Sequence, residues 1–160
     1  MKIKAWMLVA ALVLPGMAWA YTDDEQVEFS SAIVEGNVPV VKKYLDAGTF
    51  KPNEVIFGWS LLLSAAAKQQ VDVVKLLAER GADLNYRHPV TKMTAVAHAT
   101  YDNNLPLLQI LLEKGADANI KMKGGVSVLR MANDMGWTKA AELLVKYGAK
   151  NDGCQEEKCF

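Results

Sequence analysis

The sequence repeats itself with a period of about 33 residues along most of its length. Apolar runs that end in glycine recur at Gly48, Gly81, Gly115 and Gly148, at intervals of 33, 34 and 33 residues. Each run has the apolar spacing of an amphipathic helix. A period of this length predicts a solenoid of stacked units with two short helices each, and it excludes a globular domain built around one central core.

Other residues keep the same register. Gly36, Gln69, Asn103 and Gly136 each stand twelve residues before a repeat-ending glycine, and glycine and asparagine suit a tight turn between two helices. Small side chains recur as well, at Ala32, Ala65, Ala99 and Ala132. The pattern predicts first helices near 24–35, 60–68, 94–102 and 127–135, and second helices near 38–47, 71–80, 105–114 and 138–147.

These features resemble the ankyrin repeat. Gly81–Asn85 reads Gly-Ala-Asp-Leu-Asn and recurs as Gly115–Asn119, and Ser60, Thr94 and Ser127 open successive first helices. The resemblance covers residues 21–152 and implies an all-α solenoid of about four helix-turn-helix units with finger-like hairpin loops. The units are about 22–54, 55–87, 88–121 and 122–152.

The match departs from the family's Thr-Pro-Leu-His motif. Neither the proline nor the histidine follows Ser60, Thr94 or Ser127. The hydrogen bonds that this histidine makes between loops must therefore be replaced or lost. The first unit, which opens at Val27, is the weakest match and is expected to act as an N-terminal cap.

The resemblance implies a binding function. Proteins of this family use the stack as a rigid, concave binding surface and are rarely enzymes. Their contacts come from the finger tips and from the exposed side of the first helices. In this sequence those positions are Ile56, Phe57, Trp59, Ala67, Lys68, Arg87, His88, Lys92, Met93, Tyr101, Asp102, Lys121, Met122, Lys123, Val126, Asp134 and Met135. They include Trp, Tyr and Arg, which often anchor interfaces.

The first finger holds three large apolar residues, Ile56, Phe57 and Trp59, which are hard to bury in a solenoid one repeat thick. Either they meet a partner, or Phe57 and Trp59 fold back as a lid over the first unit. The fingers are also basic, and two interpretations remain open: a surface that attracts an acidic partner, or an ordinary solvated surface. The residues concerned are Lys51, Arg87, Lys92, Lys121 and Lys123, opposed by Glu54, Asp83 and Asp117.

The first twenty residues have the pattern of a signal peptide. Lys2 and Lys4 precede the apolar run Ala5–Leu14, and Ala18-Trp19-Ala20 offers small residues for cleavage after Ala20. The run is about half the length of a membrane span, so a retained anchor is the weaker alternative. The resemblance to exported bacterial ankyrin-repeat proteins then implies the periplasm, with secretion as the alternative.

The two cysteines lie close together, at Cys154 and Cys159. In an exported protein a local disulfide is expected, and with Phe160 it would form part of a C-terminal cap over residues 153–160. A redox pair or an intermolecular bridge remains the alternative.

Site chemistry for catalysis is sparse. His88 and His98 are the only histidines, and no metal, cofactor or phosphate motif is present. The 18 basic and 18 acidic residues balance, which argues against a general affinity for nucleic acid.

We therefore expect a monomer without cofactor or stable membrane insertion, which binds envelope or secreted proteins. It would stabilise or protect an envelope protein, or, alternatively, act as an immunity or inhibitor protein against a secreted toxin or hydrolase. An enzyme or small-ligand receptor is a third hypothesis, for which the sequence offers no site chemistry.

Overall fold

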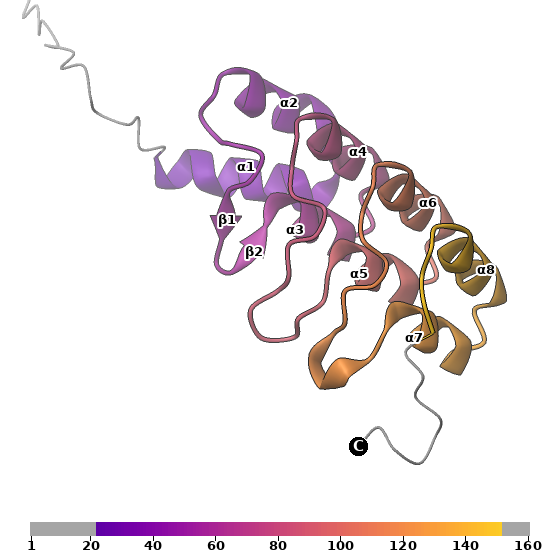
Figure 1. The fold of residues 1–160 in the computed structure, drawn as a ribbon. Helices are drawn as coiled ribbons and strands as arrows, with labels where there is room; N and C mark the ends of the chain where they lie inside the picture. Colours follow the sequence, from indigo (N-terminus) through magenta and orange to yellow (C-terminus); the bar gives the residue numbers. More distant parts are fainter. Residues whose placement is uncertain (1–21, 152–160) are drawn as a thin grey trace, which may run out of the picture.

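The computed structural model describes residues 22–151, and in this part of the chain eight α-helices form four stacked helix-turn-helix repeats (Figure 1). The first helices lie side by side in one row and the second helices in another. The first row is α1 (Asp23–Glu35), α3 (Leu61–Ala67), α5 (Ala95–Tyr101) and α7 (Val128–Asp134); the second is α2 (Val38–Asp46), α4 (Val71–Glu79), α6 (Leu105–Glu113) and α8 (Thr138–Lys146).

All eight predicted helix ranges agree with the structure to within one residue at each end. The predicted signal peptide (1–20) and the disulfide between Cys154 and Cys159 lie outside the described residues, and both stay predictions. Long loops join each second helix to the next first helix, and they project from the same side of the stack (Figure 1). The first loop holds a short antiparallel hairpin, β1 (Val55–Ile56) and β2 (Trp59–Ser60), and the third holds a 3₁₀ turn at Lys123–Gly125.

Side-chain caps mark the start of six of the eight described helices, all except α4 and α8. Ser60, Thr94 and Ser127 precede α3, α5 and α7, and each buried hydroxyl accepts a hydrogen bond from the backbone N–H three residues later, at 3.1–3.3 Å. Asn37 and Asn104 do the same for α2 and α6. Each cap satisfies a donor that has no partner within its own helix.

The core is one continuous layer between the two rows of helices. Leu77, Leu111 and Leu144, which occupy equivalent places in α4, α6 and α8, are fully buried. The alanines that recur in the first helices are also buried, which allows neighbouring repeats to approach closely: Ala32, Ala65, Ala99 and Ala132.

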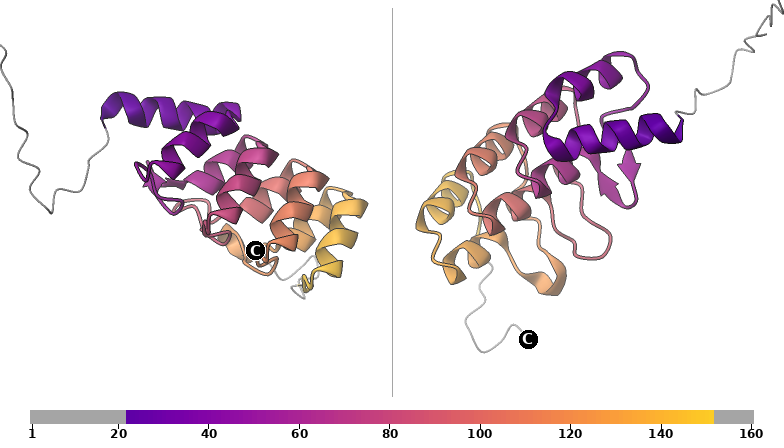
Figure 2. Two further views of the ribbon diagram at one scale, coloured as in Figure 1. Left: turned by 90° about the horizontal axis from the view of Figure 1, so that it is seen from above. Right: turned by 180° about the vertical axis from the view of Figure 1, so that it is seen from behind.

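An aromatic cluster closes the N-terminal end of this core. The rings of Phe29 and Phe50 stack with centroids 4.0 Å apart, and Tyr44 meets both edge-on at 5.6 Å. The Tyr44 hydroxyl donates to Glu28, which raises the pKa of Tyr44 to about 12. Because α1 has thirteen residues against seven in each other first helix, it extends beyond the stack (Figure 2).

Asparagines bond neighbouring loops to each other. The side-chain oxygens of Asn53, Asn85 and Asn119 each accept a backbone N–H from the following repeat, at 2.6–2.8 Å. Asn53 and Asn119 also donate to backbone carbonyls of the following repeat, at 3.1–3.2 Å. These amides provide hydrogen bonds between loops in a sequence that lacks the family's histidine.

Candidate binding surface

The tip of the first finger exposes Phe57. Ile56 pairs with Trp59, so the turn has two central residues, Phe57 and Gly58, with φ of 51° and 83°. Positive φ at both positions is the type I′ geometry that asparagine and glycine favour. A left-handed backbone costs a residue such as phenylalanine about 1–2 kcal/mol. Phe57 is nevertheless 93% exposed, so no contact within the described part of the chain compensates for that cost.

Trp59, two residues on, is half-buried against the next repeat. Its ring centroid lies 4.6 Å from that of His88 in the second finger and 5.9 Å from that of His98 in α5. The Tyr86 hydroxyl donates to the Gly58 carbonyl at 2.9 Å, which fixes the hairpin further. The two aromatic residues of this loop therefore differ: Phe57 is exposed to solvent, whereas Trp59 packs within the stack.

His98 is a packed side chain. Burial lowers its pKa, the nearby Asp102 carboxylate raises it by a smaller amount, and His88 lowers it. Its Nε2 atom is buried without a hydrogen-bond partner among the described residues. His88 instead orders its own loop, because its Nδ1 accepts from the backbone N–H of Thr91 at 3.2 Å. This arrangement places the two imidazoles in structural roles.

An apolar hollow of about 210 Å³ lies between α1, α3 and the β1–β2 hairpin. We call it the apolar notch. Val34, at its edge, is 40% exposed, and Val27, two turns earlier on α1, is 66% exposed. The notch is lined by Ser30, Ile33, Val34, Ile56, Phe57, Trp59, Leu61 and Ser64.

The second and third fingers are joined by hydrogen bonds. Arg87 Nη2 donates to the carbonyl of Lys121 at 2.8 Å, and the N–H of Lys123 donates to the carbonyl of Thr91 at 3.2 Å. Arg87, Lys92, Lys121 and Lys123 are all exposed. We call these four residues the basic fingertips.

The structure brings most of the predicted binding residues to the fingers and to the ends of the first helices, but their exposure differs. Phe57, Lys68, Arg87, Lys92, Tyr101, Lys121, Lys123, Asp134 and Met135 are exposed, whereas Ile56, Trp59, Ala67, His88, Met93, Asp102, Met122 and Val126 are partly buried. Sequence reasoning missed the contribution of α1. The spacing of Val27, Ser30 and Val34, at i, i+3 and i+7, could have indicated it.

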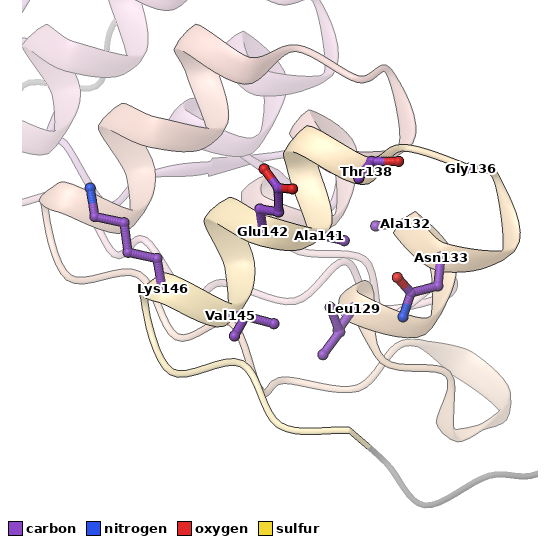
Figure 3. A pocket seen from close by; sticks show the side chains of 9 residues that line it. All are labelled: Leu129, Ala132, Asn133, Gly136, Thr138, Ala141, Glu142, Val145 and Lys146. Atoms are coloured by element: carbon purple, nitrogen blue, oxygen red, sulfur yellow. The ribbon is translucent and has the colours of Figure 1, made fainter.

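A larger hollow, of about 630 Å³, lies at the C-terminal end of the stack, between α7 and α8 (Figure 3). It is lined by Leu129, Ala132, Asn133, Gly136, Thr138, Ala141, Glu142, Val145 and Lys146. Each earlier repeat is covered on this side by its successor, and no described residue covers the last one. The hollow is therefore the open end of the core.

Within residues 22–151, no group of three His, Cys, Asp or Glu side chains is placed to hold a metal ion. None of the helices in this part of the chain has the length and apolar character that a membrane span requires.

A family model for ankyrin repeats in three copies matches residues 29–122. The chain belongs to the ankyrin-repeat family. It is 25% identical over 132 residues to the "Ankyrin repeat, SAM and basic leucine zipper domain-containing protein 1" of Dasypus novemcinctus, a match that covers 81% of this chain and 28% of that protein. It is 34% identical over 110 residues to the "Ankyrin repeat and SAM domain-containing protein 6" of Rattus norvegicus, covering 65% of this chain and 12% of that protein.

The ankyrin-repeat chain thus spans little more than a quarter of the length of the first relative. The family assignment confirms the predicted all-α solenoid. It also indicates a protein–protein interaction module, and ankyrin-repeat proteins are in general non-catalytic.

Proposed function

We propose that this ankyrin-repeat protein is exported to the periplasm, where its concave face and fingers bind an envelope protein and stabilise or protect it. The observation that carries the binding site is Phe57, an exposed aromatic side chain in a strained turn beside the apolar notch. Strain that no internal contact offsets is typical of functional positions. The proposed protein is a non-catalytic monomer without a cofactor, and it neither binds nucleic acid nor inserts stably into the membrane.

Export is supported by residues 1–20, where two lysines precede a short apolar run and an Ala-Trp-Ala cleavage motif. The full chain should be expressed in a Gram-negative host and recovered by osmotic shock. We expect the intact mass of the recovered protein to match a chain that begins at Tyr21. A chain that keeps Met1 and remains with the membranes would contradict cleavage and favour an anchor.

Binding is tested by capture of partners with the purified protein and with two variants. Phe57→Ala removes the exposed ring, and Val145→Ala, on the second-helix row, removes an exposed apolar side chain elsewhere. We expect one envelope protein to be captured by the wild type and by Val145→Ala but not by Phe57→Ala. Its cellular lifetime should fall when the gene for this chain is deleted. Equal capture by all three forms would remove Phe57 from the site.

The same experiment addresses the alternative function. Phe57 is 93% exposed, so its ring is available to contact the cleft of a secreted toxin or hydrolase, as an immunity or inhibitor protein would require. A tight one-to-one complex that abolishes the activity of such an enzyme would favour inhibition over the stabilising role.

A further inference from the structure

The binding surface has two chemically different parts that lie next to each other. The apolar notch belongs to the first and second repeats, whereas the basic fingertips belong to the second and third fingers. Trp59 packs on His88, and Arg87 bonds to the carbonyl of Lys121, so the three fingers form one continuous surface. The notch and the basic fingertips thus lie on neighbouring parts of this surface.

The notch has the size and polarity for one large apolar side chain. Its volume of about 210 Å³ is below the roughly 300–1,000 Å³ of sites that hold drug-sized molecules. Val34, Ile56 and Trp59 supply apolar walls. Phe57 stands at its rim, where its exposed ring can cover an inserted side chain.

The basic fingertips have no acidic neighbours along the chain. Neither residues 84–101 nor residues 118–133 contain an Asp or Glu. Asp83 and Asp117, at the bases of these fingers, each accept a backbone N–H at 2.8 Å within their own turns. Because the whole chain has balanced charge, the four basic fingertips are a local excess of positive charge.

The geometry points to a partner segment with two features. We infer that a protein segment binds here in which one large apolar residue enters the notch while two or more acidic residues, about three to six positions away, meet the basic fingertips. Neighbouring helices are about 10 Å apart, and an extended chain advances about 3.3 Å per residue. A distance of one to two helix spacings therefore corresponds to about three to six residues. The inference rests on the proposed binding function and specifies the partner's chemistry.

An anionic membrane surface would also meet exposed basic and apolar side chains. It is less well matched to this surface, since the notch is a recess between two helices and a hairpin that a discrete side chain can fill. Binding to a lipid surface in place of a protein segment would overturn the inference.

The test is selection of a phage-displayed library of random twelve-residue peptides on the protein purified after expression of residues 1–160. Binders are counter-selected on Phe57→Ala, whose circular dichroism should match the wild type because the ring is exposed. We expect the enriched peptides to share an aromatic or large aliphatic residue with at least two acidic residues three to six positions away. Enrichment of peptides without acidic residues, or of none at all, would overturn the inference.

Charge reversal provides the second arm, measured by fluorescence anisotropy with the most enriched peptide. Lys121→Glu/Lys123→Glu should weaken its binding at least tenfold at low salt, with less effect at 0.5 M NaCl. Lys75→Glu/Lys139→Glu makes the same change of charge on the second-helix row and should leave binding unchanged. Equal effects of the two double variants would contradict a role for the basic fingertips.

Vesicles of phosphatidylglycerol and phosphatidylcholine complete the test. Sedimentation with these vesicles that depends on Phe57 and Lys121, in the absence of peptide enrichment, would replace the protein segment by a membrane. The inference can fail while the proposed function stands. This is the outcome if partner capture is lost in Phe57→Ala but the partner's contacting segment has no acidic residues.

Discussion

At the scale of single residues, the clearest conflict between stability and function lies at Phe57. A type I′ turn favours asparagine at this position, yet the chain places there a phenylalanine that is 93% exposed. Trp59, in the same hairpin, contributes to the fold through its contacts with His88 and His98. Two aromatic residues in one loop thus have opposite roles, which their sequence spacing alone does not distinguish.

Replacing Phe57 by asparagine should stabilise the protein. Asparagine adopts the left-handed conformation more readily, and removing an exposed ring sacrifices no internal packing. We expect Phe57→Asn to raise the free energy of unfolding by about 0.5–1 kcal/mol while abolishing partner capture. Urea denaturation measures the first effect. A loss of stability would show that the ring packs against the chain.

Gly36 should be less replaceable than Gly48. Both have positive φ, 81° and 72°, so alanine is strained at either position by about 1 kcal/mol. At Gly36 an added Cβ would lie 2.3 Å from Oε1 of Gln70, whose Nε2 donates to the Val34 carbonyl at 2.7 Å. At Gly48 no atom lies within 4 Å of the added Cβ.

We therefore expect Gly36→Ala to cost about 1 kcal/mol more than Gly48→Ala, because it also disturbs the hydrogen bond between the first two repeats. Urea denaturation of both variants provides the comparison. Equal losses would mean that the Gln70 side chain moves aside without consequence.

At the scale of elements, the sequence predicted the helices well because most helix starts depend on local chemistry. Ser60, Thr94 and Ser127 cap their helices through hydrogen bonds that span three residues. The candidate site was predicted less completely, since its shape depends on contacts between elements. The notch requires α1 and the first hairpin to meet, and although the spacing of Val27, Ser30 and Val34 marks one face of α1, it does not specify which segment packs there.

The packing of the first hairpin on α5 should make stability depend on pH. The pKa of His98 is lowered mainly by burial, with Asp102 opposing and His88 adding to the effect. The unfolded chain, where this pKa is about 6.5, therefore binds the proton more readily than the folded one. The stability contributed by neutral His98 is present above pH 6.5 and is lost as pH falls below it.

The variant His98→Gln lacks this titration. Melting temperatures should be measured by circular dichroism for both proteins at pH 7.5 and pH 5.0. We expect the melting temperature of the wild type to fall more than that of the variant between pH 7.5 and pH 5.0. A difference between the two proteins that stays constant with pH would contradict a lowered pKa.

At the scale of the whole molecule, the two ends of the stack are closed differently. The long α1 and the cluster of Phe29, Tyr44 and Phe50 cover the N-terminal end of the core. The C-terminal end of the described part of the chain has the open hollow between α7 and α8. In a solenoid each repeat is stabilised by its neighbours, so a repeat with one neighbour opens first unless something covers it.

The sequence predicts that residues 153–160, with Cys154, Cys159 and Phe160, form a C-terminal cap. If they cover the hollow, deleting residues 152–160 should speed amide hydrogen exchange in α7 and α8 by at least about tenfold, equivalent to about 1.4 kcal/mol, and leave α3 to α6 unchanged. Exchange should be measured by mass spectrometry under non-reducing conditions.

A chain in which the same nine positions carry glycine and serine should exchange like the deletion, because a polar tail cannot fill a hollow lined by Leu129, Ala132 and Val145. Unchanged exchange in α7 and α8 after the deletion would contradict the predicted cap and would leave this end of the core open to another occupant.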